Sequence, residues 1–278
     1  MYSWNQDEWN LESTLLEPEI DKQPDKNPPQ DIAPWTTQQT FFGTLITLIP
    51  WIILTLLLST LNGSVKFTQP LSFQADLTGA VVTIIFSALI EGAFLIAPLY
   101  YANAAFRSIT PHARKALQAL GFRRFRFGNA MFWVIILMII IFSINTFYSY
   151  LITVLHLNVQ TNDELLLQQS KVAPLTTYAT LFVAVIIAPF CEEVFFRGFV
   201  FPGLRHGMSL VWAIIISSLL FGVAHADPGS FPVLFAIGLA LAFLRWRTQS
   251  IWPCMILHML NNGIAALAIV LSMQGVIK

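Results

Sequence analysis

The chain has 278 residues, of which 56% are hydrophobic and only 11% are charged. Soluble globular domains carry about 25% charged residues, so this composition excludes an ordinary soluble protein and indicates a membrane protein. The formal net charge is zero. Both cysteines lie in apolar runs, and this excludes a secreted disulfide framework.

The first 40 residues differ in composition from the rest of the chain. They hold eight acidic residues against Lys22 and Lys26, a net charge of −6, so the remainder carries +6. Polar residues and Pro dominate this segment, which has too little apolar periodicity to build a core. We predict that residues 1–40 form an acidic, disordered tail without a cleavable signal, followed by membrane-embedded parts at 41–126 and 127–278.

Seven apolar segments follow the tail, and none shows the period-two alternation of a barrel strand. About 20 apolar residues cross a bilayer as a helix, whereas open sheets leave unsatisfied backbone groups in lipid. The sequence therefore predicts an all-α, polytopic transmembrane helical bundle of about seven spans. The expected spans are 41–61, 77–101, 128–155, 174–204, 209–226, 230–247 and 251–273.

The positive charges fall mainly in connections that share one side of the membrane if seven spans alternate. The positive-inside rule then places the N-terminus in the cytoplasm, as in a bacterial-type cell membrane. Nucleic acid is not an expected partner, because these cations flank apolar spans instead of covering one solvated face. The cations are Arg107, Arg114, Lys115, Arg123, Arg124, Arg126, Arg205, Arg245 and Arg247.

Six ionisable residues interrupt the predicted spans. A charge near the bilayer centre costs about 2.5–3.5 kcal/mol on insertion scales, so such residues face a wet cavity or a partner. We expect a structural role for Glu91, which stands alone on its span. The six residues are Glu91, Glu192, Glu193, Arg197, His225 and His258.

The two adjacent acids are predicted to have different surroundings. Helical spacing places Arg197 four residues after Glu193, which is the favourable order for an ion pair. Glu192 points about 100° away around the helix and is expected to face a cavity. A second interpretation stays open, in which both acids and Arg197 form one charge cluster that packs helices together.

Two further pairs share a helix face at a spacing of four residues, Phe221 with His225 and His258 with Asn262. At 1.5 Å per residue, His258 lies roughly 10 Å from the cytoplasmic end of its helix, and Glu192 and Asn262 lie roughly 17 to 20 Å deep. His225 lies roughly 25 Å deep, so it requires a tilted or shorter helix to meet the others. We expect the four polar groups to converge near the bilayer middle.

Three motifs occur in a fixed order, Glu192-Glu193-x-x-x-Arg197, Phe221-x-x-x-His225 and His258-x-x-x-Asn262. Together they resemble the CPBP family of CAAX-prenyl-protease and bacteriocin-processing (Abi) intramembrane endopeptidases. The catalytic core that this resemblance implies covers about residues 174–272, and residues 1–126 contribute nothing to it.

The resemblance implies hydrolysis of a peptide bond by a glutamate mechanism without a cofactor. Its substrate would be a peptide or protein, with or without a lipid anchor, reached from the bilayer. The implied catalytic residues are Glu192, which activates water, His225, which assists, and His258 and Asn262, which stabilise the oxyanion. Supporting roles are implied for Glu193, Arg197 and Phe221.

Other functions remain as alternatives. Glu192, His225 and His258 offer the two-His-one-carboxylate set of a zinc site. The same fold could serve a non-enzymatic immunity or scaffold protein, and a proton-relaying transporter would also use intramembrane acids. The motifs of zinc site-2, rhomboid serine and aspartyl intramembrane proteases do not occur in the sequence. Cys191 is expected to be a packing residue.

Overall fold

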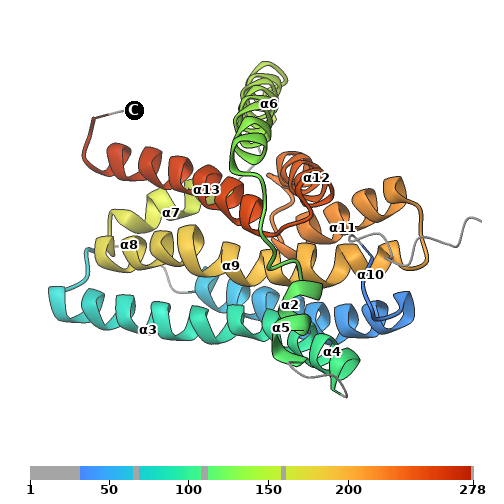
Figure 1. Ribbon diagram of the computed structural model, residues 1–278. Coiled ribbons are helices and arrows are strands. Elements are labelled where there is room, and N and C mark those ends of the chain that lie inside the picture. The colour runs from blue at the N-terminus through green and yellow to red at the C-terminus, as the bar shows by residue number, and fades with distance from the viewer. Residues whose placement is uncertain (1–31, 65–68, 108–111, 158–160, 277–278) are drawn as a thin grey trace, which may run out of the picture. The chain divides into compact units, whose positions relative to one another are not determined.

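The computed structural model describes residues 32–64, 69–107, 112–157 and 161–276 (Figure 1). Within these ranges every regular element is a helix and none is a strand. The prediction of an all-α fold is therefore confirmed. Residues 1–31, which make up most of the predicted tail, lie outside the described residues.

Each described helix is named by its label and bounds. In chain order they are α2 (Thr37–Ser64), α3 (Phe73–Gly92), the 3₁₀ turn η2 (Ala93–Leu95), α4 (Ile96–Phe106), α5 (His112–Ala119), α6 (Phe127–Val154), α7 (Asn162–Ser170), α8 (Pro174–Phe182), the π-helical turn η3 (Val183–Ile187), α9 (Ala188–Glu193), the π-helical turn η4 (Val194–Val200), α10 (Phe201–Arg205), α11 (Leu210–Ala224), α12 (Phe231–Thr248) and α13 (Trp252–Met273).

Six helical stretches in the described ranges are long and apolar enough to cross a membrane, and α11 is a shorter apolar helix. The α11 helix has 15 residues, which span roughly 22 Å against a hydrocarbon core of about 30 Å. The prediction of about seven spans is confirmed, one of them short. The six stretches are Thr37–Leu57, Phe73–Phe106, Phe127–Val154, Pro174–Arg205, Phe231–Thr248 and Trp252–Met273.

The described structure begins at residue 32, before the predicted end of the tail at residue 40. The α2 helix begins at Thr37, and Trp35 just before it is buried. The Trp35 indole donates a hydrogen bond from Nε1 to the carbonyl oxygen of Phe199 (3.2 Å) and stacks on the Phe199 ring with centroids 5.4 Å apart. The acidic composition of residues 1–40 concealed this aromatic anchor.

The stretch from α8 to α10 crosses the middle of the bundle and is interrupted by two π-helical turns. Pro189 is the second residue of the helix after η3, and Pro202 is the second residue of the helix after η4. Proline has no N–H to donate to the carbonyl four residues earlier, so the turn before it widens. All seven residues of η4 are buried, and the α9 helix between the two turns carries Glu192 and Glu193.

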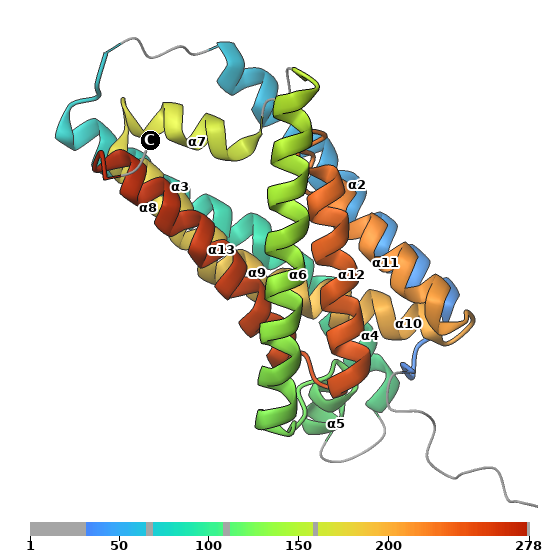
Figure 2. The same cartoon turned by 90° about the horizontal axis from the view of Figure 1, so that it is seen from above.

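The remaining helices surround this stretch. The α3 helix packs along α8, and α12 packs against both α6 and α11, as the two views show (Figure 2). The Phe94 ring contacts Trp51 on α2 and Phe195 on η4, each with centroids 5.1 Å apart. Large apolar side chains are exposed along α2, α3 and α6, which is expected of faces that meet lipid instead of water.

One predicted loop cation is instead fully buried. Arg245 lies in the last turn of α12, with none of its surface exposed, and its Nε donates to the carbonyl oxygen of Arg197 (3.1 Å). Its guanidinium also packs against Gly121, where a Cβ atom would lie only 3.0 Å from Nε of Arg245. The φ of +92° at Gly121 is also a conformation that favours glycine. Arg245 thus joins α12 to η4 and does not face the cytoplasmic surface, where the charge pattern had placed it.

Candidate active site

Glu192 faces two imidazole rings that come from different helices. Its Oε2 atom lies 3.8 Å from Nε2 of His225 at the end of α11 and 3.9 Å from Nε2 of His258 on α13. This oxygen is buried and accepts no hydrogen bond from any described residue. Buried polar atoms in folded proteins nearly always have a partner. The structure therefore brings three predicted site residues together around one unsatisfied carboxylate oxygen.

His225 caps the C-terminal end of α11. Its Nδ1 lies 2.8 Å from the carbonyl oxygen of Phe221, one turn earlier. A carbonyl only accepts, so Nδ1 carries the proton in this contact and a neutral ring keeps its lone pair on Nε2. That lone pair is directed toward Glu192. The fold thus brings His225 within reach of Glu192, although its position along the helix predicted a greater depth.

The backbone around His225 is fixed from a second helix. The indole Nε1 of Trp51 on α2 donates to the carbonyl oxygen of Ala224 (2.9 Å). Ala226, on the other side of His225, has a φ of +48°, a left-handed conformation that is unfavourable for residues with a Cβ atom. Such a conformation persists only where its surroundings enforce it.

Asp227 ties together the elements that follow His225. Its Oδ1 accepts from the backbone N–H of Ser230 and its Oδ2 from the backbone N–H of Asn162, both at 3.1 Å. The buried carboxylate therefore joins the loop before α12 to the first turn of α7. Burial and the nearby charge of Asp227 raise the pKa of Asp163 above its ordinary value.

Glu193 interacts with both Arg197 and His258. Its Oε1 accepts from Nη1 of Arg197 (3.0 Å) and lies 2.9 Å from Nδ1 of His258. The predicted ion pair with Arg197 is confirmed, whereas the contact with His258 was not predicted, because no spacing rule relates α9 to α13. Nη2 of Arg197 donates to the carbonyl oxygen of Gly238 (3.2 Å), so the buried cation also joins η4 to α12.

Phe221 fills the space beneath these groups and is fully buried. Its ring centroid lies 4.6 Å from that of His225 and 5.5 Å from that of His258. The Arg197 guanidinium lies over the same ring, with Cζ 4.3 Å from the centroid. Phe221 thus packs beneath His225, and its ring lies between the Arg197 guanidinium and the His225 imidazole.

Asn262 lies one turn beyond His258 but is held by a different partner. Its Nδ2 donates to the carbonyl oxygen of Ala184 on η3 (2.9 Å), and its Oδ1 accepts from Nδ2 of Asn261 (3.2 Å). No hydrogen bond joins Asn262 to Glu192, His225 or His258 among the described residues. An amide has two N–H groups, so one remains after the bond to Ala184.

Glu91 is an acid of the site that the sequence did not predict. It lies where α3 changes to η2, only 7% of its surface is exposed, and its Oε2 has no hydrogen-bond partner among the described residues. Both α3 and η2 pack against α9, which carries Glu192 and Glu193. Glu91 therefore lies where these elements meet, an approach that no spacing in the sequence indicated.

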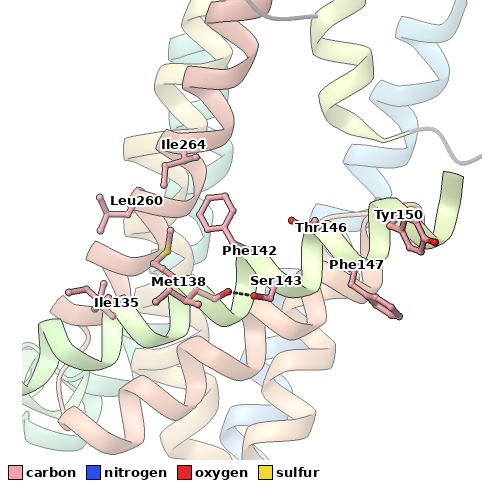
Figure 3. Close-up of a pocket in the computed structure, with 11 residues that line it drawn as sticks. Ile135, Met138, Phe142, Ser143, Thr146, Phe147, Tyr150, Leu260 and Ile264 are labelled. Carbon is pink, nitrogen blue, oxygen red and sulfur yellow. Dashed lines mark hydrogen bonds between the residues drawn. The ribbon is translucent and has the colours of Figure 1, made fainter. Parts of the chain in front are cut away.

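An apolar groove lies on another face of α13. It encloses about 990 Å³ between α6 and α13 and contains none of the predicted catalytic residues (Figure 3). Within its wall, Ser143 donates to the carbonyl oxygen of Ile139 (2.8 Å). The groove is lined by Val134, Ile135, Met138, Ile139, Phe142, Ser143, Thr146, Phe147, Tyr150, Leu260 and Ile264.

In the described ranges, no group of three or more His, Cys, Asp or Glu residues is arranged to hold a metal ion.

The part of the chain that carries the site matches a known family. Residues 174–264 match the family model described as "Type II CAAX prenyl endopeptidase Rce1-like". This segment is similar to the Rce1-like family. It includes all four predicted catalytic residues, so the resemblance to CAAX proteases that the motifs indicated is confirmed.

Individual relatives of this chain come from several bacteria. "Putative membrane peptidase YdiL" of Bacillus subtilis (strain 168) is 33% identical over 101 residues, covering 36% of this chain and 40% of the relative. "Membrane-embedded CAAX protease MroQ" of Staphylococcus aureus (strain USA300) is 30% identical over 104 residues, covering 35% and 42%. An "Uncharacterized protein" of Mycoplasma capricolum is 35% identical over 142 residues, covering 46% and 40%.

The matched regions thus cover about two fifths of each relative's own length. No solved structure matches the chain.

Proposed function

We propose that this protein is an intramembrane endopeptidase that hydrolyses a peptide bond with a water molecule activated by Glu192. The observation that carries this proposal is the unsatisfied Glu192 Oε2 atom, which faces two imidazole nitrogens at 3.8 and 3.9 Å. These separations are too long for direct hydrogen bonds. They allow one water molecule to contact the carboxylate and a ring at once, as a hydrolytic base requires.

In the proposed reaction, Glu192 takes a proton from water while the water oxygen attacks the scissile carbonyl carbon. The Nε2 lone pair of His225 accepts a hydrogen bond from the same water and orients it. The proton then passes from Glu192 to the amide nitrogen as the C–N bond breaks. The carboxylate thus acts as a base in the first step and as an acid in the second.

His258 and Asn262 are the proposed donors to the oxyanion. Nε2 of His258 faces the site and donates when it carries a proton, while Nδ1 is occupied by Glu193. Asn262 contributes the N–H that does not bond to Ala184. Donors that are already oriented stabilise the developing negative charge without further reorganisation.

Glu193, Arg197 and Phe221 support these groups. Glu193 fixes the tautomer and orientation of His258 in the way that a carboxylate orients a catalytic imidazole. Arg197 compensates the charge of Glu193 and links η4 to α12. Phe221 supports both imidazole rings from below.

The proposed substrate is a peptide or protein at the membrane, with or without a lipid anchor. The names of the relatives YdiL and MroQ, a membrane peptidase and a CAAX protease, support a peptide substrate. The positive-inside rule supports a cytoplasmic N-terminus in a bacterial-type cell membrane. The proposed mechanism requires no cofactor. The alternative is a zinc-dependent mechanism, in which Glu192, His225 and His258 would be the metal ligands.

The proposal is tested by comparing cells that produce the wild-type protein, Glu192→Gln or Glu164→Gln. The second variant makes the same chemical change outside the site. We expect that new protein termini, identified by mass spectrometry of membrane fractions, occur with the wild type and Glu164→Gln and disappear with Glu192→Gln. Identical termini in all three, at equal protein levels, would contradict a peptidase that depends on Glu192.

A further inference from the structure

A strongly basic segment connects two long spans. Residues 107–126 contain six Lys or Arg residues and no acidic residue, and they link the stretches Phe73–Phe106 and Phe127–Val154, each long enough to cross a membrane. A connection between consecutive spans lies at a membrane surface. The segment is therefore placed among lipid headgroups, whichever side of the membrane it occupies.

The described residues 114–124 of this segment line a pocket of about 650 Å³, which combines guanidinium groups with apolar side chains. Three of its six lining residues are arginines, and none is acidic. The pocket is lined by Arg114, Leu117, Gln118, Phe122, Arg123 and Arg124.

The α5 helix presents two different faces. Ala116 and Ala119 are buried against the bundle, while Arg114 and Leu117 are exposed. Arg123 reaches back over the end of the helix, where its Nε donates to the carbonyl oxygen of Gln118 (2.6 Å). The guanidinium of Arg123 is thereby held at the pocket. The exposed Leu117 adds an apolar contact of the kind that acyl chains make.

The pocket packs against two of the three helices that carry the candidate active site, α9 and α13. The Phe122 ring contacts Phe190 on α9 and Trp252 at the start of α13, with centroids 6.4 and 5.4 Å away. The hydroxyl of Ser250 donates to the carbonyl oxygen of Arg123 (2.8 Å). The base of the pocket thus packs on the ends of helices that carry Glu192 and His258.

We propose that this pocket binds the phosphate group of an anionic phospholipid. Arginine offers paired N–H donors that match phosphate oxygens, and several arginines at one membrane surface attract anionic headgroups. The apolar lining from Leu117 and Phe122 suits the glycerol and the first acyl carbons. The location between two spans favours a lipid over a free ion or a soluble partner.

The test uses the full-length protein in a neutral detergent and measures the binding of phosphatidylglycerol by native mass spectrometry. The pocket variant is Arg114→Gln with Arg124→Gln, which removes two exposed cations that line the pocket. The matched control is Lys115→Gln with Arg126→Gln, which removes the same charge from the same segment outside the pocket. We expect about a tenfold or greater loss of affinity in the first variant and less than a twofold loss in the second.

Further binding measurements identify the source of the phosphate. Phosphatidylcholine should bind more weakly than phosphatidylglycerol, and millimolar inorganic phosphate should compete with the lipid. Equal losses in the two double variants would overturn the proposal, because they would show a diffuse charge effect. Binding of inorganic phosphate, or of a peptide of residues 1–31, without any binding of phosphatidylglycerol would also overturn it. The measurement requires no substrate, so its outcome is independent of the proposed peptidase activity.

Discussion

Nδ1 of His258 and Oε1 of Glu193 lie 2.9 Å apart, while Nε2 of the same ring lies 3.9 Å from Oε2 of Glu192. Two adjacent acids on α9 therefore contact opposite edges of one imidazole. Glu193 is occupied by His258 and Arg197, whereas Glu192 Oε2 has no hydrogen-bond partner among the described residues. This difference is the structural basis for assigning the base to Glu192 and a supporting role to Glu193.

Replacing Arg197 should weaken the fold together with the activity. In Arg197→Ala, the buried Glu193 carboxylate loses its cation, and the loss of one partner of a buried pair costs about 3–5 kcal/mol. We expect a lower unfolding temperature and a lower yield of folded protein, measured by thermal unfolding in detergent. The exposed Arg126→Gln serves as the control. A variant with unchanged stability but no activity would instead indicate direct contact between Arg197 and the substrate.

Asn262→Ala should lower kcat by about 10²-fold and leave KM nearly unchanged, because an oxyanion donor acts mainly in the transition state. Steady-state cleavage of a membrane peptide separates the two constants. Asn261→Ala is the comparison, since it removes a hydrogen bond to Oδ1 of Asn262 but leaves that amide in place. A rise in KM alone in Asn262→Ala would show that Asn262 binds substrate and does not stabilise the oxyanion.

Chelation should leave the activity unchanged if Glu192 acts without a metal. We expect equal cleavage rates before and after prolonged treatment with 1,10-phenanthroline or EDTA. Loss of activity that added zinc restores would favour the zinc alternative, in which Glu192, His225 and His258 are ligands.

Asp163 should destabilise the folded protein near neutral pH, because burial and the charge of Asp227 raise its pKa on folding. A raised pKa means that the folded state binds the proton more tightly, so this penalty falls as pH drops through the raised pKa. Asp163→Asn should therefore raise the unfolding temperature at pH 7 relative to Glu164→Gln. The difference should disappear under acidic conditions. An equal difference at both pH values would show that the charge of Asp163 is not its cause.

The sequence predicted the helices well but their three-dimensional contacts less completely. Long apolar runs fixed the last four spans to within about two residues, because a helix in lipid satisfies its own backbone. Short-range spacing also predicted the pair of Glu193 with Arg197 and that of Phe221 with His225. Each of these contacts joins two residues of the same continuous helical stretch, where periodicity determines which residues are neighbours.

Contacts between helices could not be predicted in the same way. No periodicity relates Glu193 to His258 or Trp51 to Ala224, because these contacts depend on how separate helices pack. Charge was also misleading at Arg245, which the positive-inside pattern assigned to a loop but which is buried in α12. A buried arginine that joins two helical elements and a cytoplasmic arginine have the same signature in a single sequence.

The most direct test of the account is the cleavage rate of purified Glu192→Gln in lipid vesicles, compared with the wild type and Glu164→Gln. The variant keeps the size and polarity of the side chain but cannot accept a proton from water. We predict a loss of about 10²–10⁴-fold in kcat, with an unchanged unfolding temperature and unchanged substrate binding. Wild-type activity in Glu192→Gln would contradict the assignment of Glu192 as the catalytic base.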